Sequence, residues 1–346
     1  MNKLKVGIIG YGGFGRFLHR CWETVSQVEV VAVSKRSLPP GSLGPVQVYN
    51  DWRELIAQPE ISLVVIATPP AQHMEMACAA MEAGKHVLIE KPLATSLEDG
   101  QKILSVRDQT GMVAGINHLL RFNPIIKAII ALTKEGVFGP LRRADVENYA
   151  GDEGLPPDHW FWDHSVSGGI IIEHGVHFFD IINQLTTEKP RKISAFGYWR
   201  NRVQEDRVVI NILYSEGLIA THYHLFARPS DFESTTVRLA YDLAQFDISG
   251  WVPLEGRITA LLEADKLAKL NRLPNLEIQD IQSLKGRSKV SATFSLPKPK
   301  QAVYADCARS LLLDLIQKIN NPQHRLEVPL EDGLAALEIA QMAAAY

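Results

Sequence analysis

The sequence predicts an α/β protein, in which an N-terminal doubly wound parallel sheet is followed by an α+β domain with a large, mostly antiparallel open sheet. Three observations predict this fold. A charge-free apolar run at 6–9 leads directly into a glycine-rich turn. Short apolar runs then alternate with helical patterns up to residue 116, which is typical of a parallel sheet covered by helices. From residue 192 onward, mostly strand-like runs predict the second sheet.

The glycine-rich turn has the G-x-G-x-x-G spacing of dinucleotide-binding units. The first glycine, Gly10, would make the tight turn, Gly12 would let a pyrophosphate approach, and Gly15 would let the helix expected at 14–24 lie close to the strand. The N–H groups at a helix start attract phosphate. Because a strand and a helix flank the glycines, we expect dinucleotide binding rather than a plain glycine turn. The candidate phosphate-binding residues are Gly10, Gly12, Gly13, Phe14 and Gly15.

The alternation of strands and helices predicts a dinucleotide-binding domain over 1–121. Further strands are expected at 28–33, 46–49, 63–67, 86–90 and 112–116. Helices are expected from a cap at Asn50 or Asp51 to Ala57, at 72–83, and after a cap at Thr95 or Ser96. Ligands of such sheets lie at the carboxyl ends of the strands. The residues expected there are Gly10, Ser34, Thr68, Glu90, Lys91 and Asn117.

The turn after the strand at 28–33 bears on which dinucleotide binds. An NAD-binding unit usually places an acidic residue there to hold the ribose 2′-hydroxyl. This chain has Ser34, Lys35 and Arg36, a hydroxyl and two cations that suit a 2′-phosphate. The alternative is a solvated basic turn. The sequence therefore favours NADP(H) over NAD(H).

The segment Glu90-Lys91-Pro92 is a second candidate for chemistry. A lysine that leaves a buried strand beside a cofactor can hydrogen-bond a substrate oxygen, and a cis bond before Pro92 would direct its side chain. The alternative is a surface Lys-Pro turn at a helix entrance.

Together these motifs resemble those of the Gfo/Idh/MocA family, the oxidoreductases related to glucose–fructose oxidoreductase and inositol dehydrogenase. The resemblance rests on the glycine motif at 10–15, on Thr68-Pro69 with His73 nearby, and on Glu90-Lys91-Pro92. It implies a Rossmann domain followed by an α/β domain with a large open sheet. It also implies that the protein oxidises or reduces a sugar, a cyclitol or a related hydroxyl through bound NAD(P), that Lys91 contacts substrate, and that Pro92 is cis. The cofactor-binding set then gains Pro69 and His73.

The alternating pattern stops at residue 121, and we expect a substrate-binding and oligomerisation domain over 122–346. Similar Arg-Phe-Asn-Pro segments in the family lie by the cleft, which implies that Arg121 and Asn123 touch cofactor or substrate. A cap for a helix at 124–133 is the alternative for Asn123. In the aromatic loop that follows, we expect Trp160 to contact substrate and Trp162 to anchor the loop.

The segment 170–185 predicts a buried helix with a polar stripe. Glu173 and His177 are four apart and so share a face, which Asp180 and Gln184 extend. Buried carboxylate and imidazole groups are costly unless they are paired or face water, so the stripe indicates a site. It resembles the second signature of the family, in which an acid precedes a histidine by four. The resemblance implies that His177 is the general acid/base, with Glu173 where Asp is usual.

A metal site is the alternative interpretation of these histidines. Glu173, His174 and His177 could be ligands, with His222 and His224 as further ones. His174 lies one position off the stripe, and neither cluster has a recognised metal-site spacing. We therefore expect no metal.

The remaining pattern predicts the open sheet and the helices of the second half. A broad antiparallel sheet with one apolar face uncovered by helices needs a partner, so we expect a homodimer or homotetramer through the sheet. Expected strands are 142–149, 192–198, 208–214, 218–225 and 235–241. Expected helices are an insertion at 255–273, then 302–319, and 332–345 near the domain junction.

Composition excludes several classes of protein. The 346 residues are 46% hydrophobic with a net charge of −3, which gives no basic footprint for nucleic acid. No apolar run reaches the length of a membrane span, and the N-terminus reads as a strand rather than a signal peptide. Cys21, Cys78 and Cys307 are odd in number and far apart, which indicates a reducing, cytoplasmic setting.

The function expected from these features is hydride transfer between nicotinamide and a sugar, a cyclitol or a related polyol or ketone. His177 would move the hydroxyl proton, Lys91 would hold the reacting oxygen, and Glu173 would orient His177 or grip a neighbouring hydroxyl. Two alternatives remain open. One is a redox-neutral glycosidase-like or lyase-like enzyme that retains its NAD, and the other is a non-catalytic metabolite sensor.

Overall fold

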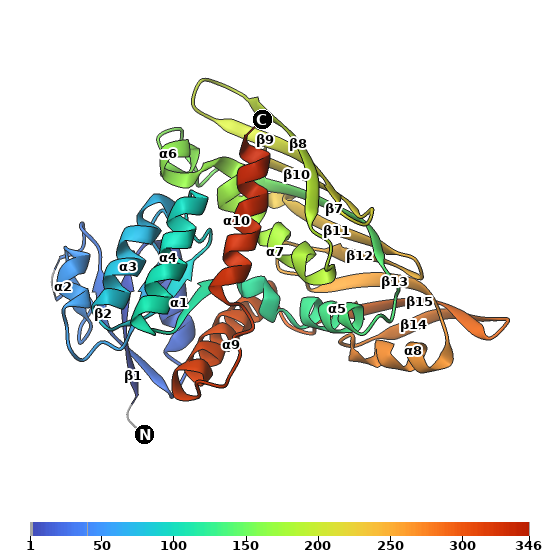
Figure 1. Ribbon diagram of the computed structural model, residues 1–346, viewed down its shortest axis with the longest axis horizontal. Coiled ribbons are helices and arrows are strands. Elements are labelled where there is room, and N and C mark those ends of the chain that lie inside the picture. The colour runs from blue at the N-terminus through green and yellow to red at the C-terminus, as the bar shows by residue number, and fades with distance from the viewer. Residues whose placement is uncertain (1–2, 40, 346) are drawn as a thin grey trace. The chain divides into compact units, whose positions relative to one another are not determined.

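The computed structural model describes residues 3–39 and 41–345, which form two compact units (Figure 1). The first unit comprises the chain up to residue 119 together with 164–168 and 305–338, and the rest forms the second unit. The segment 305–338 packs within the first unit, whereas our prediction grouped it with the second domain. One contact that holds it is a hydrogen bond of 3.1 Å from the Trp22 indole to the Ala308 carbonyl.

The first unit is built on a parallel sheet with the strand order β3-β2-β1-β4-β5-β6. Strand order reverses on either side of β1, which creates the switch point where such sheets bind ligands. The predicted doubly wound sheet is therefore confirmed. Its strands are β1 Leu4–Ile9, β2 Val28–Ser34, β3 Gln47–Tyr49, β4 Leu63–Ile66, β5 His86–Glu90 and β6 Ala114–Asn117.

The helices of this unit begin and end at residues that local chemistry favours. Asp51 caps α2 by accepting a hydrogen bond from the Arg53 N–H, and Ser96 caps α4 by accepting one from the Asp99 N–H. Gly111 ends α4 in a left-handed conformation, with φ of 68°. The helices are α1 Gly13–Trp22, α2 Trp52–Ile56, α3 His73–Glu82, α4 Leu97–Thr110 and α6 His164–Ser167. Most of α9 (Lys300–Asn320) and the first part of α10 (Leu330–Ala344) also belong to this unit. Among all described helices, none is long and apolar enough to cross a bilayer.

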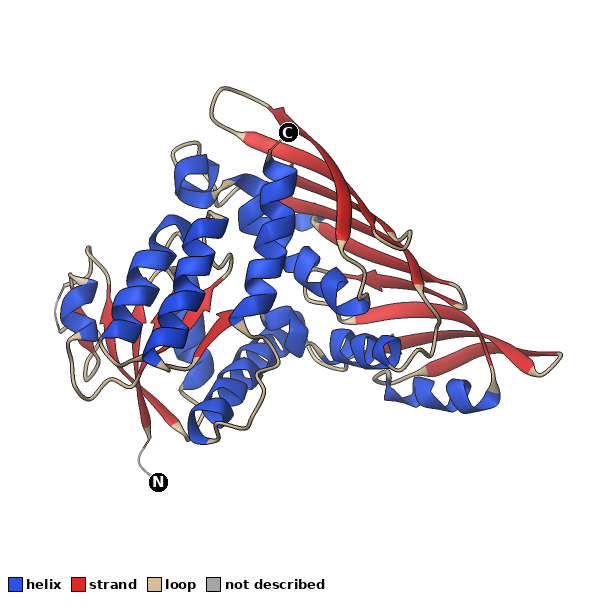
Figure 2. Cartoon of the chain, in the orientation of Figure 1, coloured by secondary structure: helices blue, strands red, loops and turns tan. Residues whose placement is uncertain are grey.

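The second unit is built on a broad sheet with the strand order β14-β15-β13-β12-β11-β7-β10-β9-β8 (Figure 2). Neighbouring strands are antiparallel except for β10 and β7, which pair in parallel. The predicted mostly antiparallel open sheet is confirmed. Its strands are β7 Leu141–Gly151, β8 Pro190–Trp199, β9 Glu205–Tyr214, β10 Ile219–Arg228, β11 Ser234–Tyr241, β12 Ala244–Ser249, β13 Glu255–Leu262, β14 Glu277–Leu284 and β15 Arg287–Ser295.

The predicted inserted helix at 255–273 is wrong over its first half. Residues 255–262 form β13, and only a short helix, α8 (Ala264–Lys269), follows it. The buried side chains of Ile258, Ala260 and Leu262 alternate with exposed or half-exposed ones. Burial therefore repeats every two residues, as in a strand, rather than every 3.6 residues, as in a helix. Without knowledge of the neighbouring strands, the charged residues between them resemble the solvent-exposed face of a helix.

The two faces of the broad sheet differ. One face packs against helices α5 (Pro124–Lys134) and α7 (Val176–Leu185) (Figure 2). The other face is exposed, and over β8 to β10 it is apolar: Phe196 is 68% exposed, and Leu213 and Ile219 are also exposed. Over β7 and β11 to β13 the same face carries charged pairs such as Arg143–Asp145 and Arg238–Asp247. The strip over β8 to β10 lies at one end of the sheet, and β14 at the other end also carries exposed aliphatic residues, Ile278, Ile281 and Leu284.

The predicted helix at 170–185 has two parts. A π-helical turn over Ile171–Gly175 precedes α7. Such turns are rare and are frequent at functional sites. The turn carries Glu173 and His174, and α7 carries His177.

Candidate functional site

The glycine motif forms a cradle at the end of β1. Gly10 has a φ of 91°, and a Cβ there would collide with the backbone of Ala67. A Cβ on Gly15 would collide with the Gly10 carbonyl oxygen. In contrast, no described atom lies within 4 Å of the position that a Cβ on Gly12 would take. Gly10 and Gly15 thus close the turn onto α1, while Gly12 leaves room at the helix N-terminus. These residues fit a bound pyrophosphate.

The basic turn after β2 is held in a defined conformation. The Ser34 carbonyl accepts a hydrogen bond of 3.0 Å from the Gly10 N–H, which ties the turn to the glycine cradle. The Asn50 side-chain amide lies 3.1 Å from each of the carbonyl oxygens of Lys35, Arg36 and Leu38. Asp51 is the cap of the next helix, so Asn50 braces this turn instead. Arg36 itself is exposed and Lys35 is half-buried.

The other residues predicted near the cofactor gather at the same edge of the sheet. Thr68 and Pro69 follow β4, Glu90 ends β5, and Asn117 ends β6. Glu90 and Asn117 are register partners, and the Asn117 amide donates a hydrogen bond to the Glu90 carboxylate. The Lys91–Pro92 peptide bond is cis, as predicted.

His73 lies beneath this edge rather than on its surface. Its side chain is fully buried. Nδ1 lies 2.8 Å from the Pro92 carbonyl oxygen, and Nε2 lies 2.9 Å from the Thr68 carbonyl oxygen. The ring therefore connects the loop after β4 with the loop that carries Lys91.

In the second unit, a buried ion pair holds helix α7. The Arg121 guanidinium lies 3.0 Å from the Asp180 carboxylate, and both side chains are almost fully buried. Burial raises the pKa of Asp180 to about 6, although the Arg121 charge opposes this shift. Asn123 caps α5 and donates its amide to the Pro253 carbonyl at 2.8 Å. Both side chains thus brace the segment that enters α5.

The aromatic loop is fixed mainly by Trp162. Its ring is buried, its indole N–H donates to the Leu155 carbonyl at 3.0 Å, and the Arg200 guanidinium lies over it. Trp160 is half-buried and contacts the rings of His159 and Phe161.

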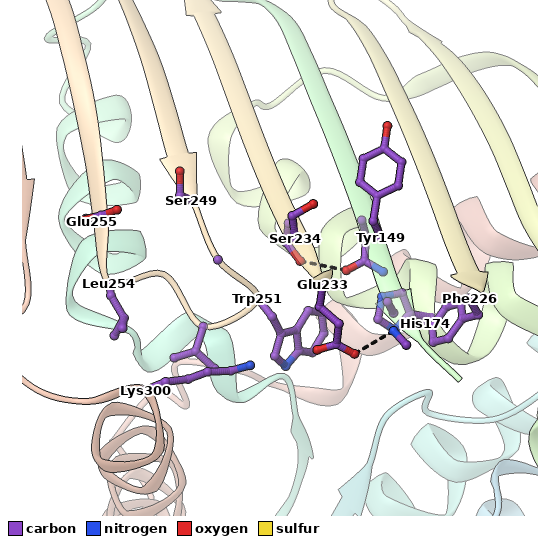
Figure 3. Close-up of a pocket in the computed structure, with 16 residues that line it drawn as sticks. Tyr149, His174, Phe226, Glu233, Ser234, Ser249, Trp251, Leu254, Glu255 and Lys300 are labelled. Atoms are coloured by element: carbon purple, nitrogen blue, oxygen red, sulfur yellow. Dashed lines mark hydrogen bonds between the residues drawn. The ribbon is translucent and has the colours of Figure 1, made fainter. Parts of the chain in front are cut away.

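A cavity of about 580 Å³ lies within the second unit, at the ends of β7, β10, β11 and β12 (Figure 3). This volume is enough for a small organic ligand. Asn148 lines it and is 3% exposed; its Oδ1 accepts from the Thr235 hydroxyl, while its Nδ2 has no partner among the described residues. The lining residues are Asn148, Tyr149, Ala150, Gly151, His174, Phe226, Glu233, Ser234, Thr235, Ser249, Gly250, Trp251, Val252, Leu254, Glu255 and Lys300.

Trp251 connects this cavity with His177. The Trp251 ring stacks on His174 at a centroid distance of 5.0 Å and meets the His177 ring edge-on at 4.6 Å. Sequence reasoning missed Trp251, and it considered His174 only as a possible metal ligand. The signal that could have found Trp251 is an aromatic residue in a Gly-Trp turn between two strand-like runs. The structure thus brings a titratable histidine, an indole and a ligand-sized cavity together.

His222 and His224 lie in the core behind the cavity. Both are fully buried on β10, and His224 meets the His174 ring at 5.3 Å. Burial lowers the pKa of each to about 3. Their ring nitrogens have no hydrogen-bond partner in the part of the chain that the structure describes. Within that part, no three His, Cys, Asp or Glu side chains gather in a way that could hold a metal ion.

The fold and the glycine cradle together define a dinucleotide-binding α/β protein with a second domain built on an open sheet. Comparison with known proteins gives the family. The profile described as an oxidoreductase family with an NAD-binding Rossmann fold, GFO_IDH_MocA, matches residues 4–118, and the profile of the GFO/IDH/MocA C-terminal domain matches residues 126–239. The chain belongs to the Gfo/Idh/MocA family.

Curated relatives include enzymes named for sugar and inositol substrates. The chain is 31% identical to 1,5-anhydro-D-fructose reductase of Ensifer adhaerens over 50% of this chain and 53% of that protein. It is 26% identical to scyllo-inositol 2-dehydrogenase (NADP(+)) of Bacillus subtilis over 52% of this chain and 51% of that protein. It is 30% identical to scyllo-inositol 2-dehydrogenase (NAD(+)) of the same organism over 45% of this chain and 44% of that protein. The chain spans about half the length of the curated relatives that it matches.

Solved structures share the fold over the whole chain. An oxidoreductase domain protein from Kribbella flavida has a TM-score of 0.81 and 18% identity, and the match covers 99% of this chain and 96% of that one. At this identity the match supports the fold alone.

Proposed function

We propose that this protein is an NAD(P)-dependent oxidoreductase acting on a sugar, a cyclitol or a related polyol or ketone. The observation that carries the proposal is the contact of His177 with Trp251, by which an imidazole lies next to the wall of a ligand-sized cavity. The glycine cradle and the names of the curated relatives support it. When bound, the nicotinamide would supply the hydride chemistry.

The residues of the chain would position the substrate and move its proton. His177 would take the proton of the reacting hydroxyl during oxidation and return it during reduction. Lys91, which follows β5, would hydrogen-bond the same oxygen and stabilise the negative charge that develops on it. Glu173, in the π turn, would orient His177 or bind a neighbouring hydroxyl.

A screen of substrates against both cofactors tests this function directly. Polyols, cyclitols and keto-sugars are each mixed with the protein and either NAD(H) or NADP(H), and nicotinamide absorbance is followed. Turnover with at least one member of these classes is expected. Substrate conversion without net change of the cofactor would instead support a redox-neutral enzyme, and no conversion of any member would contradict the proposal.

Selection of NADP(H) over NAD(H) is the finer proposal for the cofactor, and Arg36→Ala tests it. We expect the affinity for NADP(H) to fall about tenfold to a hundredfold, because a charge-assisted hydrogen bond to the 2′-phosphate is lost, while NAD(H) binding stays unchanged. Dissociation constants are measured by fluorescence titration. Arg53→Ala, which removes an exposed arginine of α2, is the control. An equal loss of affinity for NADP(H) and NAD(H) would rule out a contact of Arg36 with the 2′-phosphate.

The cavity is our proposed site for the substrate, and Trp251→Ala tests it. Aromatic rings stack on the apolar faces of sugar rings, and the unpartnered Asn148 amide can donate to a hydroxyl. We expect KM for the substrate to rise at least about tenfold while the dinucleotide dissociation constant stays the same. Trp52→Ala, on α2 outside the cavity, is the control. An unchanged KM would remove the cavity from the proposal.

We propose that the protein forms homo-oligomers through the broad sheet and that the exposed apolar strip of β8 to β10 is the interface. This strip includes Phe196, Leu213 and Ile219. Phe196→Glu would place a charge in the buried interface, so we expect a lower oligomer at micromolar concentration. Light scattering after size-exclusion chromatography gives the mass. Ile278→Glu, on β14 at the other end of the sheet, is the matched control. A monomeric native protein, or an unchanged Phe196→Glu mass, would contradict the proposal.

A further inference from the structure

His73 makes two short contacts that a neutral imidazole cannot both satisfy. Nδ1 lies 2.8 Å from the Pro92 carbonyl oxygen and Nε2 lies 2.9 Å from the Thr68 carbonyl oxygen. Carbonyl oxygens accept hydrogen bonds and never donate them, and a neutral imidazole has a single N–H. If the ring were neutral, one of the two contacts would therefore bring an unprotonated ring nitrogen against a carbonyl oxygen. Both atoms are hydrogen-bond acceptors, so this contact would be repulsive.

We propose that His73 is held as an imidazolium in the folded protein and that its two N–H groups position the loop carrying Lys91. Both hydrogen bonds then have a donor and an acceptor, and both are charge-assisted. His73 begins α3, where the helix dipole disfavours a cation, and the ring is buried. The two charge-assisted hydrogen bonds, both below 3 Å, offset the cost from the dipole and the cost of burial.

The consequence concerns Lys91. The Thr68 carbonyl belongs to the loop after β4, and the Pro92 carbonyl belongs to the loop after β5, next to Lys91. Strands β4 and β5 pair in parallel, so both loops leave the same edge of the sheet. One ring thus ties the Lys91 loop to its neighbour. His73 is a positioning residue: it is fully buried, and it acts through the backbone beside Lys91.

His86 provides a matched control within the same unit. It begins β5, at the end of the strand far from Lys91. Its Nδ1 accepts a hydrogen bond of 3.0 Å from the Val113 N–H, so this nitrogen carries no proton. Burial also lowers the pKa of His86. The two histidines are thus expected to differ in protonation at the same pH, His73 with two N–H groups and His86 with one.

Nuclear magnetic resonance of the full chain with 15N-labelled histidine tests the charge. The His73 resonances are assigned by their loss in His73→Phe, or in His73→Gln if the first variant does not fold, and those of His86 by their loss in His86→Phe. At pH 8 we expect both ring nitrogens of His73 to carry protons, and one nitrogen of His86. A single protonated nitrogen on His73 would overturn the proposal. This measurement needs no substrate and no turnover.

Kinetics test the positioning role, and this arm rests on the proposed function. We expect His73→Phe to lower kcat about tenfold to a hundredfold, because small misplacements of a catalytic group have effects of this size, with less change in KM. His86→Phe is expected to keep the native kcat. Equal kcat for His73→Phe and native protein would overturn the positioning role. A native protein inactive towards every polyol would contradict the proposed function while the resonance test of His73 stands.

Discussion

Replacing His177 by alanine is expected to lower turnover by about 10²- to 10⁴-fold, the range of general acid–base catalysis, while dinucleotide affinity stays unchanged. The histidine lies on α7 in the second unit, in ring contact with Trp251 and His174. The glycine cradle lies in the first unit, after β1. Under the proposed function, loss of the imidazole removes the proton-transfer group and leaves the glycine cradle intact.

Steady-state kinetics and a fluorescence titration with dinucleotide measure the two quantities separately. Imidazole added to His177→Ala is expected to restore part of the turnover, because it can occupy the vacated space and accept the proton. His324→Ala, which removes an imidazole bonded to Asp314 in the first unit, is the control and should keep native turnover. If His177→Ala lost dinucleotide binding and turnover together, the proton-transfer role would be untenable.

The second large effect concerns acid stability. His222 and His224 are expected to reduce the free energy of unfolding by about 4 kcal/mol between pH 7 and pH 5. Burial lowers the pKa of each to about 3 in the folded protein, against an ordinary value of 6.5. Between pH 3 and pH 6.5 the unfolded chain therefore binds more protons than the folded one. The stability that these neutral rings allow is present above pH 6.5 and is lost as the pH falls below it.

Urea unfolding followed by circular dichroism at pH 7 and pH 5 measures this effect. The variant His222→Leu/His224→Leu should lose most of the pH dependence, since leucine takes up no proton. At pH 7 we expect it to be no less stable than the native protein, because four buried ring nitrogens without partners are removed. Phe179→Leu, which changes a non-titrating ring in contact with His222, should lower stability equally at both pH values. If the double variant kept the pH dependence of the native protein, the loss of stability in acid could not be assigned to His222 and His224.

Local patterns predicted much of the first unit. The strand before Gly10 and the helix after it, a cap at Thr95 or Ser96 and the strand ends at Ser34, Glu90 and Asn117 all follow from residues close together in the sequence. Turns, caps and strand ends depend on backbone conformation over a few residues, so the sequence specifies them directly. The motifs at 10–15, 68–73, 90–92 and 173–177 identified the family for the same reason.

The cavity could not be predicted in this way. Asn148, Glu233 and Trp251 are separated by 85 and 18 residues along the chain, and they meet because β7, β11 and β12 are neighbours in the sheet. Strand order is decided by long-range pairing, which no local pattern encodes. The error at 255–273 has a related cause, since the burial that defines β13 depends on the strands beside it.

The sequence by itself determined the dinucleotide-binding half, the family, and Lys91 and His177 as candidates for chemistry, because those signals lie in short segments with defined spacing. The tertiary structure alone decided that His73 lies beneath the Lys91 loop, that Arg121 pairs with Asp180, and that Trp251 joins His177 to a cavity. Contacts of this kind depend on which buried surfaces pack together, and packing is a property of the whole fold rather than of any segment.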